Sequence, residues 1–339
     1  MAERIAVVLF NLGGPDSLEA VKPFLQNLFS DPAIIAAPWI LRRPLAMLIA
    51  SRRDAMARAN YALMGGASPI LAETQAQAAA LEANLALRWP DRITKVFVGM
   101  RYWRPTIEAV SNEVMAFEPD RIILAPLYPQ FSTTTTASSF AAWRKAYTGK
   151  GETSGVCCWY DNDGLAQAHA ESILETWRRA GEPKVRLIFS AHGLPEQIVA
   201  RGDPYQWQIQ RTCDSVVARL PGQWDWKIGY QSRVGPMKWL APSTLNVIEE
   251  AHREGFGVLI DPIAFVSEHI ETLVELDHDY ANIAKGFGVT TYLRAPVVGV
   301  SPRFIDGLAS AVAVAMERRA IGPDGQGCGG CWKRCGAQV

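Results

Sequence analysis

Short, almost wholly apolar runs rich in β-branched and aromatic residues alternate along this chain with longer segments of helical period. The strands that this pattern predicts lie at 5–10, 95–100, 121–126, 156–160, 185–190, 226–231, 257–263 and 290–294. The helices that it predicts lie near 17–29, 71–88, 105–116, 135–147, 164–180, 205–219, 243–253, 269–285 and 303–319. Strands this apolar have no face that water could cover, so we expect parallel sheets with helices on both sides.

The order of these features also repeats within the chain. Residues 97–110 and 227–248 each read as a strand, an aromatic residue, a basic residue, a proline and a helix. Residues 122–138 and 258–273 each read as a strand, a proline, an aromatic residue, a serine and a polar helix start. The sequence therefore predicts an α/β fold of two similar Rossmann-like lobes, with ligands in a cleft between them near the carboxyl ends of the strands.

The first lobe, expected at 1–150, contains a stretch that departs from this pattern. Residues 31–66 mix Trp, Ile, Leu and Met with a pair of arginines at each end of the apolar part. One interpretation is an ordinary buried helix with solvated arginines. The other is an apolar lip around a cleft, which rests on a membrane surface or admits a flat apolar ligand. The second lobe is expected at 151–320, followed by a cysteine-rich tail at 321–339.

Charge and hydropathy exclude several classes of partner. Lys and Arg number 34, as do Asp and Glu, so no overall field attracts the chain to nucleic acid or to acidic lipid, and we expect no nucleic-acid partner. No uncharged apolar run reaches the roughly 18 residues of a spanning helix. The first residues enter a strand directly, without the layout of a signal peptide. The expected location is the cytoplasm, and peripheral contact of the lip with the inner membrane is an open alternative.

His192 follows the apolar strand "VRLIF" within the motif "FSAHGLP" (189–195). Proteins with parallel sheets place functional groups at this end of a strand. An imidazole there can exchange a proton near neutral pH or ligate a metal ion. The structural alternative is a histidine that is hydrogen-bonded to a loop carbonyl.

A second candidate site lies in "SEHIETLVELDHDY" (267–280). On a helix, Glu271 and Glu275 share one face, and His278 and Asp279 lie a further turn along. A column of carboxylates that leads to an imidazole suits a hard divalent cation that is passed on rather than caged. The structural alternative is a solvated acidic face.

Aromatic and hydroxyl-bearing residues close to the predicted strand ends are candidates for binding a flat ligand. Tyr61, Tyr128 and Trp239 are among them, although most aromatic residues of such a chain belong to its core. The segment "STTTTASS" (132–139) begins a helix with hydroxyl and backbone N–H groups that suit carboxylates. Arg53 would supply a bidentate partner for a propionate.

Three cysteines lie close together in the tail "GCGGCWKRCG" (327–336). Thiolates this close repel one another unless a cation joins them, so Cys328, Cys331 and Cys335 indicate a zinc site or an iron–sulfur cluster. Either metal centre needs a fourth ligand, for which Cys157 and Cys158 are the candidates. Adjacent residues of a strand face opposite ways, so only one of the two should reach the metal. Free thiols are the alternative.

These motifs together resemble those of the ferrochelatase family. The resemblance runs through "NLGGPDS" (11–17), "GGASPI" (65–70), "MRYWRP" (100–105), "LYPQFSTTTTASS" (127–139), "FSAHGLP", "YQSRVGPMKWLAPST" (230–244) and "FVSEHIETLVELDHDY" (265–280). Each motif alone is modest, but their order and spacing over nearly the whole chain are specific. The resemblance implies a lyase that inserts Fe²⁺ into protoporphyrin IX and releases two protons, the last step of haem biosynthesis.

The resemblance also implies roles for individual residues. His192 resembles the family's active-site histidine, and Glu271 the glutamate that faces it across the porphyrin. Glu275 and Asp279 resemble an acidic ladder behind that glutamate, and these four residues would bind the iron substrate. The positions expected to hold the porphyrin are Leu12, Arg53, Tyr61, Ser68 and Trp239, with Tyr128 as a further stacking candidate. The apolar Leu12 favours the branch that uses protoporphyrin.

The tail resembles the [2Fe–2S] extension of animal and some bacterial family members. It departs from the animal pattern because its last two cysteines are closer together and because Thr133 stands where the animal fourth ligand lies. Some bacterial members take this ligand from further along the chain, which favours Cys158 as the fourth ligand, with Cys157 second. Animal members are homodimers, so a homodimer is an open alternative here.

Two other functions stay open at this point. A different chelatase would insert cobalt or nickel into a related tetrapyrrole with the same fold and histidine, although "NLGGPDS" and "MRYWRP" argue against it. A porphyrin-binding carrier would have no turnover and would not need the acidic ladder. Insertion of a metal ion into a porphyrin distinguishes an enzyme from a carrier.

Overall fold

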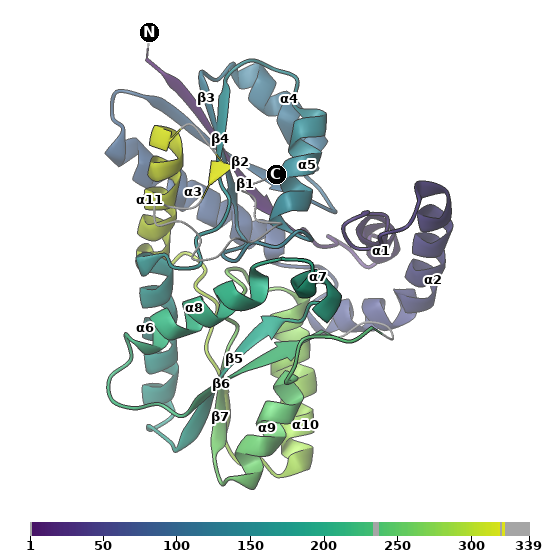
Figure 1. Ribbon diagram of the computed structural model, residues 1–339, viewed down its shortest axis with the longest axis vertical. Helices are drawn as coiled ribbons and strands as arrows, with labels where there is room; N and C mark the ends of the chain where they lie inside the picture. Colours follow the sequence, from purple (N-terminus) through teal and green to yellow (C-terminus); the bar gives the residue numbers. More distant parts are fainter. Residues whose placement is uncertain (1, 233–236, 319–320, 323–339) are drawn as a thin grey trace. The chain divides into compact units, whose positions relative to one another are not determined.

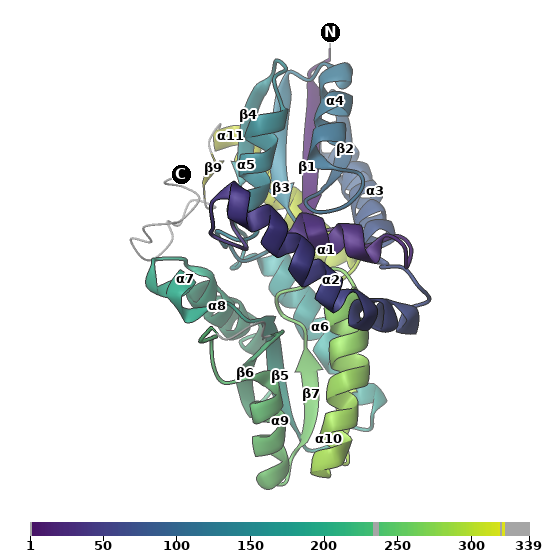
Figure 2. The same ribbon diagram turned by 90° about the vertical axis from the view of Figure 1, so that its right-hand side faces the viewer.

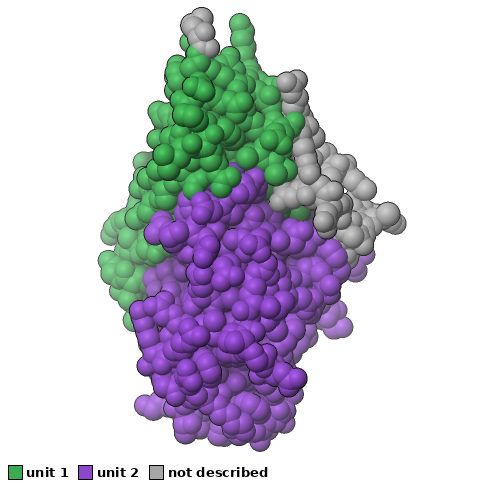
Figure 3. Space-filling view, turned by 90° about the vertical axis from the view of Figure 1, so that its left-hand side faces the viewer, with its two compact units in different colours: residues 1–127, 132–158, 312–325 green, residues 128–131, 159–311, 326–339 purple. Residues whose placement is uncertain are grey.

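A computed structural model describes residues 2–232, 237–318 and 321–322 of the chain (Figures 1 and 2). The chain divides into two units, each built around a parallel sheet (Figure 3). The first unit contains residues 1–127 and 132–158 and also the end of the last long helix, from Val312 onward. The second unit contains residues 128–131 and 159–311.

The sheet of the first unit has the strand order β2-β1-β3-β4-β9. Its strands are β1 (Arg4–Asn11), β2 (Ile93–Met100), β3 (Arg121–Pro126), β4 (Glu152–Val156) and β9 (Ile321–Gly322). Its helices are α1 (Val21–Phe29), α2 (Trp39–Leu63), α3 (Ile70–Arg88), α4 (Ile107–Phe117) and α5 (Thr136–Ala146). Figure 1 shows α4 and α5 on one side of this sheet and α3 on the other, whereas α1 and α2 lie beside each other.

The sheet of the second unit has the strand order β6-β5-β7-β8. Its strands are β5 (Val185–His192), β6 (Trp226–Gln231), β7 (Gly257–Asp261) and β8 (Tyr292–Arg294). Its α-helices are α6 (Asp163–Arg179), α7 (Glu196–Ala200), α8 (Tyr205–Val217), α9 (Thr244–Arg253), α10 (Ala281–Phe287) and the first part of α11 (Pro302–Arg318). A π-helix, η1 (Glu271–Tyr280), runs directly into α10.

The core of the second unit shows why its central strand is apolar along its whole length. Leu187 and Phe189 pack with residues of α6 and α8, whereas Ile188 packs with residues of α9, η1 and α10. Figure 1 shows these two groups of helices on opposite sides of β5, β6 and β7. Successive side chains of a strand point to opposite faces, so both faces must be apolar. The predicted parallel sheet with helices on both sides is confirmed.

The two sheets repeat the same connection, which confirms the prediction of two similar lobes. β2 and β6 occupy the same edge position in their sheets. Each strand is followed by a cis X–Pro peptide and by a helix whose first turn is capped by Thr106 or by Ser243. The backbone amides of Met100 and Tyr230 donate to the carbonyls of these prolines at 2.8 and 3.0 Å. This connection places the residues at the carboxyl ends of β2 and β6 in equivalent positions.

The strand predicted at 156–160 is wrong. β4 instead covers Glu152–Val156, pairs with β3 from Arg121 opposite Glu152, and ends before the two cysteines. Residues 157–160 form a loop in which every side chain is buried. Their apolar character therefore reflects burial in a loop and not membership of a strand.

The interpretation of residues 31–66 as an ordinary buried helix is also wrong. α2 contributes only Ala46, Ala50 and Tyr61 as buried residues. By contrast, Trp39, Ile40 and Leu41 are 63%, 65% and 64% exposed. The first turn of α2 therefore exposes three consecutive large apolar side chains to solvent.

Candidate active site

His192 is the last residue of β5, an interior strand of its sheet. The seven residues before it are buried, and the side chain of His192 is 36% exposed. The hydroxyl group of Tyr205, on α8, donates to the carbonyl oxygen of His192 at 3.1 Å. The predicted placement of His192 at the end of a buried strand is confirmed, so the sheet positions the imidazole.

The turn that follows His192 requires a glycine. The amide of Gly193 donates to the carbonyl oxygen of Gln231 at 2.9 Å. A Cβ atom on Gly193 would lie 2.9 Å from that oxygen and 3.3 Å from the ring of Trp239. A backbone bridge also joins Trp239 to Pro195. The motif "FSAHGLP" thus brings Trp239, a predicted porphyrin contact, beside the residue that follows His192.

Glu271 lies directly against the imidazole of His192. Its Oε2 atom is 2.8 Å from Nδ1 of His192, and its side chain is 19% exposed. Burial opposes ionisation of Glu271, but the charge and the hydrogen bond of His192, with smaller contributions from His269 and Ser232, together outweigh it and lower the pKa of Glu271 to about 2. Burial by itself lowers the pKa of His192, but the charge of Glu271 and the hydrogen bond outweigh it and raise that pKa. Each member of the pair therefore stabilises the charged form of the other.

This geometry corrects the expectation that Glu271 faces His192 across the porphyrin. The two side chains are in direct hydrogen-bond contact, and no macrocycle fits between atoms 2.8 Å apart. Both residues belong to the second unit. The imidazole and the first carboxylate of the ladder are therefore one hydrogen-bonded group.

Glu271 begins the π-helix η1, whereas the sequence predicted an α-helix. π-Helices are rare, occur mostly as single turns inside α-helices, and are frequent at functional sites. Glu275 lies four positions after Glu271. It accepts hydrogen bonds from the backbone amide of Ser232 at 2.9 Å and from the hydroxyl of Tyr280 at 2.7 Å. Burial and the charge of Glu271 nevertheless raise the pKa of Glu275. The second carboxylate thus holds a proton more readily than the first.

Gln231 joins the two carboxylate-bearing residues. Its fully buried side-chain amide donates to the backbone carbonyl of Glu271 at 3.1 Å and to Oε2 of Glu275 at 3.3 Å. The hydroxyl of Ser190, on β5, donates to its carbonyl oxygen at 2.6 Å. Neither Gln231 nor Ser232 was among the predicted site residues. Their signal in the sequence was two consecutive polar residues, the last residue of β6 and the one that follows it.

Asp279 does not join this chain of contacts. It pairs with the neighbouring His278 at 2.9 Å, and its side chain is 45% exposed. The hydrogen bonds of Glu275 instead go to Ser232, Gln231 and Tyr280. The contacts of the predicted ladder therefore join Glu271 and Glu275 but do not include Asp279.

The predicted porphyrin contacts outside the second unit lie in two places of the first unit. Tyr61 lies in the last turn of α2 and is buried, whereas Arg53 is half-buried, with its guanidinium 5.8 Å from the ring centre of Phe29. Leu12 follows β1 and is half-buried, and Ser68 precedes α3. In the part of the chain that the structure describes, no carboxylate forms an ion pair with Arg53. Tyr128, which belongs to the second unit, is half-buried.

A buried polar cluster in the first unit was not predicted. Asp31, which is 4% exposed, accepts hydrogen bonds from Arg101 at 2.7 Å, from the Tyr102 hydroxyl at 2.8 Å and from the Ser138 hydroxyl at 2.5 Å. Arg101 and Tyr102 belong to "MRYWRP", and Ser138 belongs to "STTTTASS". The cluster thus joins two of the motifs. Asp31, at its centre, lies 70 residues from Arg101 in the sequence, so no local pattern indicated the cluster.

The two adjacent cysteines do not face opposite ways as expected. Cys157 and Cys158 are both buried, and their Sγ atoms are 3.6 Å apart. The reason is that β4 ends at Val156, so the side-chain alternation of a strand does not extend to them. The other expected cluster ligands, Cys328, Cys331 and Cys335, lie outside the described residues.

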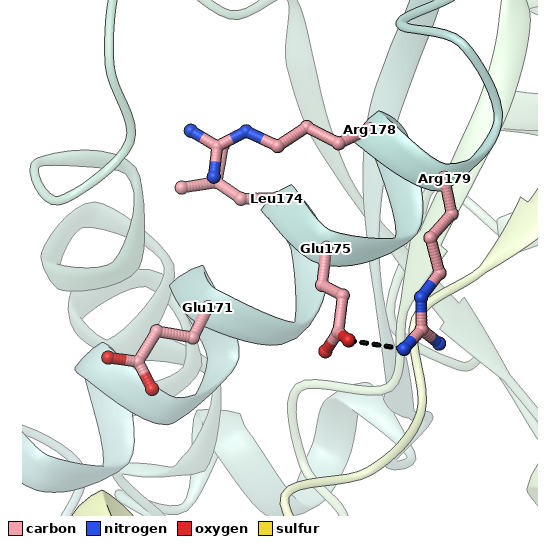
Figure 4. A pocket seen from close by; sticks show the side chains of 5 residues that line it. All are labelled: Glu171, Leu174, Glu175, Arg178 and Arg179. Carbon is pink, nitrogen blue, oxygen red and sulfur yellow. Dashed lines mark hydrogen bonds and ion pairs between the residues drawn. The ribbon is translucent and has the colours of Figure 1, made fainter.

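Three further features of the described residues bear on function. They contain no group of three or more His, Cys, Asp or Glu side chains arranged to hold a metal ion. A surface hollow of about 380 Å³ on α6 is lined by Glu171, Leu174, Glu175, Arg178 and Arg179, and Figure 4 shows Glu175 paired with Arg179. Among the described helices, none is both long and apolar enough to cross a membrane.

Comparisons with known protein families and sequences agree over nearly the whole chain. The family model described as "Ferrochelatase" matches residues 4–316. The ferrochelatase of Phenylobacterium zucineum is 57% identical over 323 residues, which cover 95% of this chain and 94% of the relative. The ferrochelatase of Caulobacter vibrioides is 55% identical over 338 residues, which cover 99% of this chain and 96% of the relative.

Comparisons with solved structures agree on the fold. The protein SirB from Bacillus subtilis, solved with Fe³⁺, matches with a TM-score of 0.53 at 10% identity, covering 92% of this chain and 95% of that one. A multi-domain protein from Deinococcus radiodurans, DR2241, is described as structurally similar to chelatases. It matches with a TM-score of 0.53 at 13% identity, covering 92% of this chain and 55% of that one. At these identities the likeness shows a chelatase-like fold.

Proposed function

Because this chain belongs to the ferrochelatase family, we propose that the hydrogen-bonded pair of His192 and Glu271 carries out the family's reaction. The protein is a lyase that inserts Fe²⁺ into protoporphyrin IX and releases two protons. The observation that carries the assignment to this pair is the 2.8 Å contact between Nδ1 of His192 and Oε2 of Glu271 at the end of a buried strand.

The first proposed role of the pair is to remove a proton from the porphyrin. A flat macrocycle binds metal poorly because its pyrrole N–H groups obstruct the central hole. Nδ1 of His192 is engaged by Glu271, so Nε2 is the ring nitrogen that accepts a pyrrole proton. The carboxylate stabilises the imidazolium that forms. Binding energy from apolar contacts with the ring would bend the macrocycle and expose a pyrrole lone pair.

Glu275 is the proposed second carboxylate on the path of protons or iron. Its raised pKa suits a group that takes up a proton and releases it again. The amide of Gln231 contacts both Glu271 and Glu275, which keeps the two carboxylate-bearing residues in register. Asp279, which is half-exposed, is supported as an iron ligand by the family resemblance alone.

The proposed porphyrin contacts are Leu12, Arg53, Tyr61, Ser68, Tyr128 and Trp239. Two observations support members of this set. Trp239 lies against Gly193, the residue after the proposed base. The guanidinium of Arg53 has no ion-pair partner among the described residues, which suits it to bind a propionate group of the ring.

Anaerobic incubation of the purified protein with Fe²⁺ and protoporphyrin IX tests the function. We expect the absorption spectrum of haem to appear with multiple turnovers per protein molecule. A carrier would shift the spectrum of the bound porphyrin without turnover, and a chelatase of another specificity would prefer cobalt or nickel and a different tetrapyrrole. Either of these results would overturn the assignment.

A [2Fe–2S] cluster held by Cys328, Cys331, Cys335 and Cys158 is the proposed cofactor of the tail. Cys158 fits this role because its thiol lies in a buried pair with a second thiol at 3.6 Å, and iron–sulfur clusters are held by thiolates. When bound, such a cluster would supply a structural or redox centre. The visible absorption of the protein, purified before any substrate is added, reports it. Cys158→Ser should remove that absorption, whereas Cys213→Ser, at a buried position on α8, should retain it.

The start of α2 is the proposed contact with an anionic membrane surface. Trp39, Ile40 and Leu41 are exposed, and Arg43 and Arg52 are exposed on the same helix. An apolar face flanked by basic residues is typical of helices that lie in the plane of a lipid interface.

Flotation with vesicles that contain phosphatidylglycerol tests this contact. The triple substitution of Trp39, Ile40 and Leu41 by serine should lower the partition coefficient at least about tenfold, because each side chain loses transfer free energy on leaving the lipid. Leu87→Ser is the matched control, because Leu87 is 85% exposed on a different helix, α3. Equal flotation of the triple variant and the wild type would contradict the proposal.

A further inference from the structure

The placement of η1 decides whether Glu271 reaches His192. The two residues are 79 positions apart in sequence, so no covalent link sets their separation. His192 is held by β5, whereas Glu271 is carried by η1. A displacement of η1 by about 1 Å would break a 2.8 Å hydrogen bond. The contacts that hold η1 against the sheet are therefore part of the geometry of the site.

The edge strand β8 provides two such contacts. Tyr292 and Arg294 are two positions apart in a strand, so their side chains point to the same face of the sheet. The hydroxyl of Tyr292 donates to the backbone carbonyl of Leu276, in the middle of η1, at 2.6 Å. The guanidinium of Arg294 binds Asp277, the next residue of η1, through two parallel hydrogen bonds at 2.6 and 2.5 Å.

Arg294 also holds the segment that leads into η1. Its Nη1 atom donates to Glu268 at 2.6 Å, and the same carboxylate oxygen accepts from the backbone amide of Val297 at 3.3 Å. The side chain of Arg294 is 11% exposed, that of Glu268 is 15% exposed and that of Asp277 is 35% exposed. A planar guanidinium with bidentate geometry fixes orientation as well as distance. Arg294 thus ties positions 268 and 277, on either side of Glu271, to one strand.

We propose that Arg294 and Tyr292 are positioning residues for iron insertion, which fix η1 to β8 and so keep Glu271 within hydrogen-bond distance of His192. This inference rests on the proposed function of the His192–Glu271 pair. Gln231, the last residue of the opposite edge strand β6, and Ser232, which follows it, hold Glu275. The two edge strands of the sheet together position the π-helix, and Arg294 and Tyr292 act through it.

Substitutions of these two residues should change turnover more than substrate binding. Arg294→Gln should lower kcat for haem formation about tenfold or more, with KM for protoporphyrin IX changed less than about twofold, because misplaced catalytic groups lose rate and not ground-state binding. Arg294→Lys keeps the charge without the bidentate geometry and should recover part of kcat. Tyr292→Phe should lower kcat by a smaller factor, about threefold, since it removes one hydrogen bond.

A second arginine of the same sheet is the matched control. Arg186, near the start of β5, is 2% exposed and binds Asp225 and Glu254, but it contacts no residue of η1 in the described chain. Arg186→Gln should lower the melting temperature but leave kcat within about twofold when the assay is run well below that temperature. If Arg186→Gln lowers kcat as much as Arg294→Gln, or if Arg294→Gln leaves kcat unchanged, the positioning role is overturned.

Hydrogen exchange of the substrate-free protein separates this inference from the function on which it rests. In Arg294→Gln the backbone amides of η1 should exchange faster relative to the rest of the unit, and in Arg186→Gln they should not. Unchanged exchange of η1 in Arg294→Gln overturns the anchoring. Failure of the wild-type protein to form haem overturns the proposed function instead, whatever the exchange experiment shows.

Discussion

Replacing His192 by alanine is expected to lower kcat for haem formation by about 10²–10⁴-fold, the range typical of a group that transfers a proton in the rate-limiting step. Nδ1 of His192 is bound to Glu271, so Nε2 is the ring nitrogen that can accept the pyrrole proton. His192→Ala removes it. Haem formation under anaerobic conditions, followed by absorbance at saturating Fe²⁺ and protoporphyrin IX, measures the effect. Added imidazole should restore part of the rate, because the substitution leaves a space beside Glu271.

His252→Ala is the control for this prediction. His252 lies near the end of α9, with its ring beside Gly288, so turnover should stay within about twofold of the wild type. The melting temperature of each variant shows whether lost activity is lost structure. Near-normal turnover of a folded His192→Ala protein would exclude His192 as the proton acceptor.

Replacing Glu271 by glutamine is expected to lower kcat about 10²-fold and to move the pH profile to lower pH. Glutamine keeps the size of the side chain but removes the charge that stabilises the imidazolium. That charge is also what raises the pKa of His192 against the opposing effect of burial. Without it burial dominates and the pKa of His192 falls. The acid limb of kcat/KM, where protonated His192 cannot accept a proton, should therefore shift to lower pH.

The pH dependence of kcat/KM for the wild type and for Glu271→Gln tests this second prediction. Glu175→Gln is the control, because Glu175 is exposed on α6 and pairs there with Arg179. It should leave both the rate and the profile unchanged. An acid limb that stays in place, or moves to higher pH, in Glu271→Gln would show that the carboxylate does not set the protonation of His192.

Local sequence patterns were sufficient to predict those structural elements that depend on residues close together in the sequence. The apolar run before His192 predicted a buried strand that ends at the histidine, and β5 ends there. The repeated order of strand, proline and helix predicted two similar lobes, and β2 and β6 are followed by the same connection. The error at 156–160 has the same origin, because an apolar run reports burial and cannot tell a strand from a buried loop.

Local sequence patterns did not predict structural features that depend on a partner far away in the sequence. The i, i+4 spacing of the acidic residues predicted an α-helix, yet Glu271 begins a π-helix. The carboxylate of Asp31 lies 70 residues from Arg101, and its role as the centre of a buried cluster left no periodic signal. The exposure of Trp39 also could not be read from its apolar neighbours, because nothing in a sequence states which face of a helix finds a covering surface.

Composition and periodicity along the chain were enough to assign the alternating parallel-sheet architecture and to select His192, because both follow from residues that are close neighbours in sequence. The contact of Glu271 with His192, the hydrogen bonds of Gln231 and Ser232 to the acidic residues, and the hold of Arg294 on η1 came only from the folded chain. Each of these joins elements separated by many residues, and a difference of about 1 Å in their placement decides whether a hydrogen bond exists.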